Sequence, residues 1–337
     1  MSGQPRISYI DTSKAIAIFL VILGHVVDVG TPMKTGLYTF HMPLFFMLTG
    51  MTYKWLSDKS WQTIKARLVR YAGALLIPYV IFALFYSKLT YSNIAFIGYS
   101  SWHALKLAGS LSSLWFLMAL FMSHVYLLLL HKVLPRQIIT TPIALSIIAL
   151  FLLVVGAYLP YGGKYGYPWM TNVAFVGAAF IMIGLLLHKM FDYYAGLNIA
   201  WRLGAFLVAT ILFVVTIPFN HPSPGYVLMA DGLYGNVALF AVIAILGATA
   251  VIMFSQISDV ILSRCTPLMW IGKNTLGIFL VHKFFINGAH IITNKMGMDY
   301  NNVTIACILS VMVLLVSCIV VTVINRFVPF LLHYEKR

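Results

Sequence analysis

Apolar runs of membrane length alternate with short polar segments along the whole chain. Helical crossings of a bilayer need about 20 mostly apolar residues. Runs of this kind predict about ten spans, at residues 12–30, 37–55, 70–88, 113–130, 139–158, 171–188, 203–219, 235–254, 274–292 and 303–324. The pattern predicts an all-α, polytopic integral membrane protein that forms a single membrane domain over residues 1–337, without a separate soluble domain.

Composition excludes a soluble protein of this size. The chain has 337 residues, of which 61% are hydrophobic and 9% charged, and its mean hydropathy is +0.93. Ordinary soluble domains are about 25% charged. The amino terminus enters the first apolar run without a small-residue cleavage site, so we expect this run to stay in the mature protein as a transmembrane helix.

Positive charge follows the predicted topology. The net charge of +14 would suggest a nucleic-acid partner in a soluble domain. With an even number of spans and both termini in the cytoplasm, however, all but six of the 22 lysines and arginines fall on the inner side. The six exceptions are Lys34, Lys88, Lys106, Lys164, Lys283 and Lys295. The charge therefore predicts cytoplasmic termini and no nucleic-acid partner.

The three cysteines predict neither a disulfide nor a metal site. Cys265, Cys307 and Cys318 show no paired spacing, and two of them fall in the last span.

Ionisable residues in the first span form the strongest local signal. Eleven residues separate Lys14 from His25, which on a helix corresponds to about 1100° and about 16 Å, so both lie on one face at different depths. Asp11 precedes Lys14 by three residues and Asp28 follows His25 by three, so we expect them on that face. Structural alternatives are open: Lys14 can snorkel to Asp11, a backbone carbonyl can satisfy His25, and Asp28 can be a loop residue.

The second span contributes another histidine. It begins with "YTFHMPLFFMLTG", where His41 lies at a depth similar to that of His25, so the two imidazoles are predicted to meet near the outer leaflet. Pro43 removes a backbone donor and can expose polar backbone to a cavity. A structural role for His41 is an equally good interpretation.

A basic segment precedes the third span. Arg67 and Arg70 are three residues apart at its cytoplasmic start, so they share a helix face and can offer guanidinium groups to phosphates. Ordinary positive-inside charge is the alternative interpretation.

Five motifs in this order resemble the integral membrane acyltransferases grouped as acyltransferase type 3. They are "IDTSKAIAIFLVILGH", "FHMPLFFMLTG", "RLVRYAGALLIPY", Leu114–Leu117 and "GKNTLGIFLVH". The first is most similar to the branch described as fucose 4-O-acetylase-like. Lys14 departs from the arginine that is usual at its position, and so lacks the planar guanidinium fork.

The resemblance implies an O-acyltransferase of the bacterial inner (cytoplasmic) membrane. It would move an acyl group, most often acetyl, from cytoplasmic acyl-CoA to a hydroxyl of a cell-envelope carbohydrate: O-antigen, exopolysaccharide or a lipid-linked sugar. His25 would act as general base or acyl carrier, with His41 and Asp28 as catalytic partners. Lys14, Arg67 and Arg70 would bind the acyl-CoA co-substrate, and no metal is implied.

Two further residues are weaker candidates for binding the acceptor. Trp115 begins the fourth span as either an interfacial anchor or a sugar-stacking platform. His282 falls near the middle of the ninth span, where a structural role is as good an interpretation as a functional one.

Two other function classes compete with the enzyme. Intramembrane His, Asp and Lys residues also build the proton relays of transporters or flippases for lipid-linked sugars, and an acyl-binding membrane sensor would bind CoA without turnover. The sequence leaves the acceptor sugar, the acyl group and homo-oligomer formation open.

Overall fold

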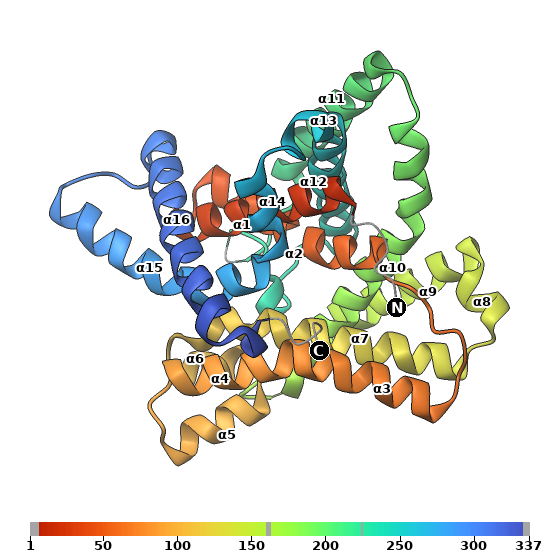
Figure 1. Ribbon diagram of the computed structural model, residues 1–337, viewed down its shortest axis with the longest axis horizontal. Coiled ribbons are helices and arrows are strands. Elements are labelled where there is room, and N and C mark those ends of the chain that lie inside the picture. Colours follow the sequence, from red (N-terminus) through yellow and green to blue (C-terminus); the bar gives the residue numbers. More distant parts are fainter. Residues whose placement is uncertain (1–6, 160–162, 224, 333–337) are drawn as a thin grey trace. The chain divides into compact units, whose positions relative to one another are not determined.

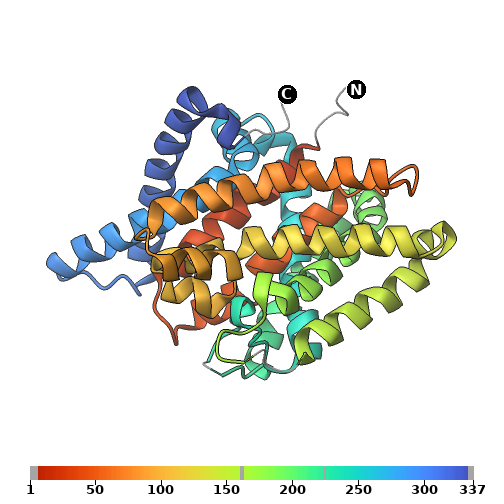
Figure 2. The same cartoon turned by 90° about the horizontal axis from the view of Figure 1, so that it is seen from below.

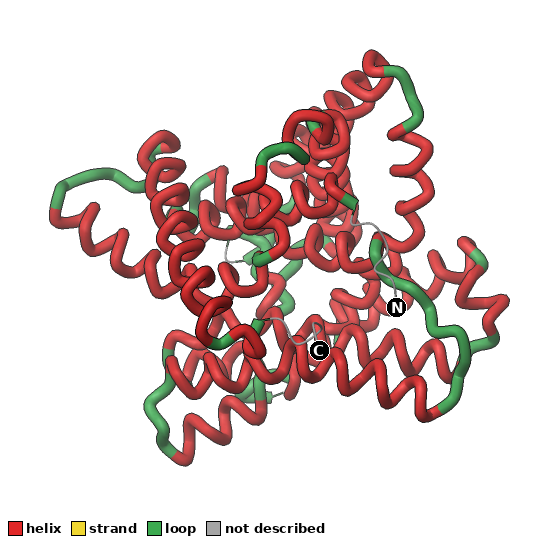
Figure 3. The backbone as a smooth tube through the Cα atoms, in the orientation of Figure 1, coloured by secondary structure: helices red, strands yellow, loops and turns green. Residues whose placement is uncertain are grey.

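The computed structural model describes residues 7–159, 163–223 and 225–332. Within these residues the chain consists of helices and loops without a β-strand (Figure 3). Each predicted span contains a helix. These are α1 (Ser8–Val26), α2 (Pro32–Met51), a rod of α3 (Trp61–Tyr71), η1 (Ala72–Leu76) and α4 (Ile77–Tyr86), α7 (Trp115–Val133), α9 (Pro142–Tyr158), α10 (Thr171–Ala195), α11 (Ile199–Thr216), α12 (Val237–Ile257), α15 (Thr275–Lys295) and α16 (Val303–Phe327).

The predicted all-α, polytopic membrane fold is confirmed. Eight helices of the described chain, counting the rod Trp61–Tyr86 as one, are long and apolar enough to cross a bilayer. The other two are α9, with 17 residues, and α2, whose first half carries polar side chains such as Lys34 and His41. The number of ten crossings and the cytoplasmic termini stay predictions.

Short helices fill the connections between the long ones. They are α5 (Tyr91–Tyr99), α6 (Trp102–Leu107), η2 (Ser110–Leu114), α8 (Arg136–Thr140), η3 (Pro168–Met170), η4 (Ile217–Phe219), η5 (Met229–Asp231), α13 (Asp259–Leu262), α14 (Thr266–Lys273) and η6 (Pro329–Leu331). Polar N-caps begin several helices: Ser60, Thr90, Ser101, Asn198 and Asn236 each accept a hydrogen bond from a backbone N–H of the first turn.

The described chain divides into two compact units. The first unit comprises Met1–Leu48, Leu187–Val227 and Gly235–Val323, and the second comprises Thr49–Leu186, Leu228–Tyr234 and Ile324–Arg337. The core of the first unit is α1, which contacts α12, α14 and α15 (Figure 1). By contrast, α11 is apolar but only 6% buried, as expected of a helix that faces lipid.

Gly272 brings α14 into backbone contact with α1. A β-carbon at this position would lie 2.1 Å from the carbonyl oxygen of Asp11. Only glycine permits this approach, because any side chain would overlap the neighbouring backbone. The close packing holds the buried start of α1 in place, including Asp11, which is 4% exposed.

The second unit contains the rod Trp61–Tyr86, the orange helix of Figure 2, which packs against α7 (yellow). The rod starts about nine residues before the predicted third span, because the amphipathic α3 continues directly into the apolar segment. A π-helical turn, η1, joins α3 to α4 just before Pro78. Proline has no N–H and its ring clashes with the preceding turn, and a widened turn accommodates both effects without breaking the helix.

Loops that the predicted topology places on the same side of the membrane contact one another. In the first unit, Asp28, near the outer end of the first predicted span, bonds to Asn301, which follows the ninth. In the second unit the pairs are Ser101 with Tyr165 from two outer loops, and Lys59 with Leu134 from two inner loops. Each pair therefore joins segments that the sequence places on one side of the membrane.

Candidate functional site

His25 lies in the last turn of α1 and meets the phenol of Tyr38 from α2. Its Nδ1 lies 3.0 Å from the Tyr38 hydroxyl oxygen, and the two rings pack edge to face with centroids 5.7 Å apart. The imidazole is half-buried. A hydrogen bond at one ring nitrogen sets the orientation and tautomer of a histidine, so Tyr38 is the residue that orients His25.

His41 packs on the same tyrosine. The ring centroids of Tyr38 and His41 are 4.9 Å apart. Nδ1 of His41 lies 2.5 Å from the carbonyl oxygen of Leu37, and since a carbonyl only accepts, this nitrogen carries the proton and Nε2 holds the lone pair. The two imidazoles that the sequence predicts near each other thus both contact Tyr38.

His282 of α15 completes a cluster of three histidines and one tyrosine. Its ring centroid lies 5.5 Å from that of His25, and the side chain is fully buried. Nδ1 donates to the carbonyl oxygen of Phe279 at 2.7 Å, so Nε2 carries a lone pair. Among the described residues this nitrogen has no hydrogen-bond partner. A buried polar atom without a partner is costly in a purely structural setting and is frequent at functional sites.

A buried lysine adds positive charge beside the cluster. Lys34 is 8% exposed and donates from Nζ to the carbonyl oxygen of Val27 at 2.9 Å. Its ammonium group also lies 5.0 Å from the Tyr38 ring centroid and 5.7 Å from that of Tyr226. These cation–π contacts offset part of the cost of burying the charge.

Sequence reasoning missed Tyr38 and Lys34, although a signal was present. Lys34, Tyr38 and His41 follow one another at spacings of four and three residues, which places them on one face of α2. The polar side chains of this face point into the histidine cluster.

Asp28 does not share the helix face of His25, which corrects the expectation from spacing. Helix α1 ends at Val26, and Val27 adopts an extended conformation with ψ of 148°, so the three-residue helical relation is lost. The Asp28 carboxylate instead accepts a hydrogen bond from Asn301 Nδ2 at 3.0 Å. Its hydrogen bond to the Tyr300 phenol raises the pKa of that phenol above the ordinary value. A catalytic role for Asp28 stays a prediction.

In the second unit, Arg67 lies half-buried on α3 and contacts aromatic side chains. Its guanidinium donates to the Tyr71 hydroxyl at 3.3 Å and lies 6.0 Å from the centre of that ring. Tyr71 packs on His124 with centroids 4.0 Å apart. Arg70, one helical turn from Arg67, is exposed. The two arginines are thus on one unbroken helix directly before the π-helical turn.

Comparison with known proteins decides the family. A family model described as an acyltransferase domain matches residues 7–322. The chain belongs to the acyltransferase type 3 family. Comparison with curated proteins gives no match.

The motifs of this acyltransferase family fall on helices that meet. The histidine-bearing motifs lie on α1, α2 and α15. In the first unit His25 and His41 both contact Tyr38, and His282 contacts His25. The motif with the paired arginines lies on α3, η1 and α4 of the second unit.

Lys14 and Trp115 are the remaining predicted site residues of this acyltransferase. Lys14 is half-buried, and α1 is unbroken from Ser8 to Val26, so the one-face relation of Lys14 and His25 follows from helical geometry. Trp115 begins α7 and is 7% exposed, with its ring edge to face against Phe116. Packing of the protein itself occupies this ring, so stacking on a sugar would need it to be uncovered.

Proposed function

We propose that this acyltransferase transfers an acetyl group from cytoplasmic acetyl-CoA to a hydroxyl of a carbohydrate of the bacterial cell envelope. The family supports acyl transfer in general. The donor, the acceptor and the roles of individual residues are our proposal. The observation that carries it is the cluster in which His25 contacts both Tyr38 and His282, and His41 packs on Tyr38.

His25 is the proposed centre of the transfer. When its Nδ1–H donates to the Tyr38 oxygen, Nε2 keeps a lone pair and can take the proton of the acceptor hydroxyl. The hydroxyl oxygen then forms a bond to the acyl carbon, the bond from that carbon to sulfur breaks, and the proton on His25 passes to the CoA thiolate. In the covalent variant Nε2 itself attacks the thioester carbon and CoA leaves as its thiolate. The acceptor hydroxyl then displaces Nε2 from the acyl carbon, and its proton passes to the thiolate.

His282 fits a site that holds a hydroxyl group, and the lysine fits one in which negative charge develops on the thioester oxygen. Nε2 of His282 gains a hydrogen-bond partner if its lone pair accepts from the hydroxyl of the carbohydrate substrate or from a protonated group of the site. The ammonium of Lys34 supplies a fixed positive charge beside Tyr38. Preorganised charge in a buried site stabilises a transition state more strongly than the same charge in water.

Arg67 and Arg70 are the proposed ligands of the CoA phosphates. Guanidinium groups bind phosphate oxygens through paired, charge-assisted hydrogen bonds. Tyr71 holds Arg67 by a hydrogen bond and by its ring face, which restricts the side chain before the donor arrives. The exposed Arg70 adds a second positive charge one helical turn away.

Acetyl transfer by the purified protein tests this function. The full chain in lipid nanodiscs receives radiolabelled acetyl-CoA and an envelope glycan, and the expected result is label in the glycan that mild alkali releases as acetate, as an ester requires. Glycan without label, together with protein-dependent sugar flux into vesicles that lack any acyl donor, would instead identify a transporter.

A further inference from the structure

A pocket of about 180 Å³ opens in the second unit, away from the histidine cluster in sequence. It is lined by the start of α6, the end of α9, the segment before α10 and the turn that contains η5. The sequence places three of these segments in outer loops. The pocket therefore brings together loops that are far apart along the chain, which the family motifs do not account for.

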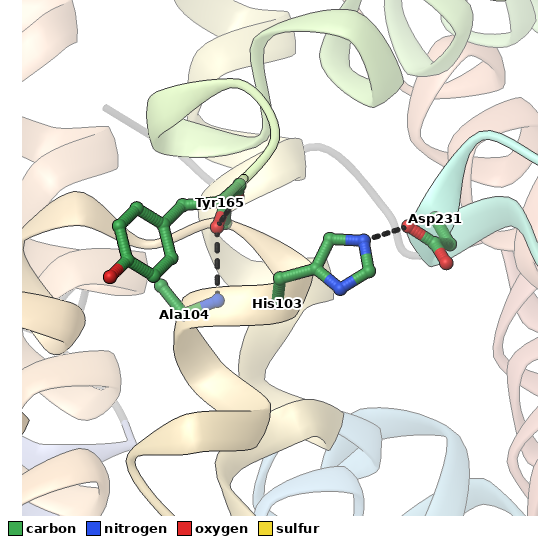
Figure 4. Close-up of polar contacts among 5 residues, drawn as sticks. His103, Ala104, Tyr165 and Asp231 are labelled. Carbon is green, nitrogen blue, oxygen red and sulfur yellow. Dashed lines mark hydrogen bonds and ion pairs between the residues drawn. The ribbon is translucent and has the colours of Figure 1, made fainter. Parts of the chain in front are cut away.

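A histidine and a carboxylate face each other in this pocket. Nε2 of His103 lies 2.9 Å from Oδ1 of Asp231, and the two side chains are 32% and 17% exposed. Figure 4 shows the pair bridging α6 and the turn of η5, with Tyr165 and Ala104 beside it. A ligand that enters the pocket can reach both side chains, and both hydrogen-bond well to hydroxyl groups.

Aromatic residues form another part of the lining. Trp102, Tyr165 and Tyr167 line the pocket and are half-buried. Tyrosine and tryptophan at the membrane surface are often simple interfacial anchors. Anchoring alone needs no polar neighbour, whereas these three residues line one hollow together with a carboxylate and an imidazole. This combination suits a ligand with one apolar face and several hydroxyl groups.

Hydrogen bonds hold the lining segments in place. The Ser101 hydroxyl donates to the carbonyl oxygen of Tyr165, and the Tyr99 hydroxyl donates to the carbonyl oxygen of Gly166 at 2.8 Å. The turn that carries Asp231 is closed by a pair of backbone hydrogen bonds between Leu228 and Leu233. A lining fixed in advance loses less conformational entropy when a ligand binds.

Backbone strain points to the same segment. Trp169 and Met170 both have positive φ, 55° and 54°, a conformation that costs bulky side chains energy. Met170 is buried and lines the pocket. Such strain persists where the surrounding structure enforces it, and it is concentrated at ligand sites.

From these observations we infer that the pocket of His103, Asp231, Trp102, Tyr165 and Tyr167 binds one sugar ring of a carbohydrate. An aromatic face of Trp102 or Tyr167 stacks on the C–H face of the ring, the Asp231 carboxylate accepts hydrogen bonds from ring hydroxyls, and His103 orients the carboxylate. The inference rests on the proposed function for the class of carbohydrate, an envelope glycan that is acylated. The volume is below the roughly 300 Å³ at which pockets for drug-sized ligands begin, which suits a single ring.

Binding of simple glycosides to the full chain, without acyl donor, tests the inference. The protein is embedded in nanodiscs of phosphatidylethanolamine and phosphatidylglycerol, because maltoside detergents carry a sugar headgroup that would compete. The probes are the methyl glycosides of glucose, galactose, mannose, fucose and N-acetylglucosamine, observed by saturation-transfer NMR. We expect transfer from the protein to the ring C–H protons of at least one glycoside.

Variants connect the signal to the pocket. Asp231→Asn keeps the side-chain shape and should weaken binding at least tenfold, and Trp102→Ala should do the same by removing a stacking face. Tyr91→Ala is the matched control, since Tyr91 lies in the same predicted outer loop, is 92% exposed and is outside the pocket lining. If the Asp231→Asn variant fails to fold, glycoside binding by the Trp102→Ala variant tests the inference. Absence of transfer from all five glycosides, or equal binding by the pocket variants and Tyr91→Ala, would overturn the inference.

The outcomes also separate this inference from the proposed function. Glycoside binding that depends on Asp231 in a protein that transfers no acetyl would keep the sugar pocket and remove the acyltransferase proposal. Acetyl transfer at the wild-type rate by Asp231→Asn and Trp102→Ala would keep the enzyme and remove the pocket.

Discussion

Replacement of Tyr38 by phenylalanine isolates the contact that orients His25. The change removes one oxygen and keeps the ring, so the packing against His25 and His41, with centroids 5.7 and 4.9 Å away, is retained. The lost interaction is the 3.0 Å hydrogen bond to His25 Nδ1. His25 then keeps its place in the cluster but loses the partner that sets its orientation and tautomer.

The size of the effect follows from the partial burial of this bond. A buried polar group that loses its partner costs about 1–3 kcal/mol. At about 1.4 kcal/mol for each factor of ten, the Tyr38→Phe variant should lose roughly 5- to 150-fold in kcat. The KM for acetyl-CoA should stay nearly constant, because the removed oxygen belongs to the histidine cluster and not to the arginine pair proposed to bind CoA.

Steady-state acetyl transfer to the glycan, with each substrate varied in turn, measures this split. Tyr193→Phe is the matched control, since it makes the same chemical change at a residue that is 73% exposed on α10. Thermal unfolding of each variant in the same nanodiscs checks that the protein is folded.

A Tyr38→Phe variant that is folded and has a kcat within twofold of the wild type would refute the reasoning. So would a variant that loses activity only through a higher KM for acetyl-CoA. Either result would mean that Tyr38 packs beside His25 without orienting it for transfer.

Two further predictions concern the donor site and the packing of α1. Combined replacement of Arg67 and Arg70 by alanine should raise the Kd for acetyl-CoA by about tenfold or more, because each charge-assisted hydrogen bond contributes about 1.5–3 kcal/mol. Titration with glycan should show an unchanged Kd. Equal weakening of acetyl-CoA and glycan binding would argue against a phosphate-binding role. Gly272→Ala should destabilise the protein by about 1–3 kcal/mol, since its β-carbon would overlap the backbone of α1. Gly288→Ala is its control, with nothing within 4 Å of the added carbon, and a thermal midpoint for Gly272→Ala that equals this control would contradict the packing argument.

The long helices were predictable because bilayer length and apolar composition largely determine them. Every predicted span contains a helix, and the motif histidines lie on those helices. The ends were less predictable, since hydropathy marks the apolar part of a helix and not its hydrogen-bonded limits. The rod Trp61–Tyr86 starts with an amphipathic segment that no apolar run reveals.

The candidate site was predictable in its histidines and not in its partners. The similar depths of His25 and His41 in two adjacent spans predict that their imidazoles meet, and both contact Tyr38. The expectation for Asp28 requires α1 to continue through this residue, but the helix ends at Val26. The identity of that neighbour, Tyr38, depends on how α2 packs against α1, and so does the approach of His282 from α15. Contacts between distant helices of this kind are set by tertiary packing, which the pattern of one sequence does not contain.

The sugar pocket shows the same limit more strongly. His103 and Asp231 are separated by more than a hundred residues and lie in loops without periodic pattern. The sequence could assign both to the outer side but could not bring them together.

Acetyl transfer by a His25→Gln variant tests the central claim most directly. Glutamine retains a polar side chain of similar reach but can neither take up a proton near neutral pH nor carry an acyl group as imidazole does. His188→Gln is the control, since His188 lies outside the cluster and pairs with Asp192 at 3.6 Å. With radiolabelled acetyl-CoA and glycan, the folded His25→Gln variant should transfer acetyl at least 100-fold more slowly than the wild type. This factor agrees with the roughly 10²–10⁴-fold contribution of general bases. The His188→Gln variant should transfer acetyl at the wild-type rate. Transfer by His25→Gln at the wild-type rate would contradict the account.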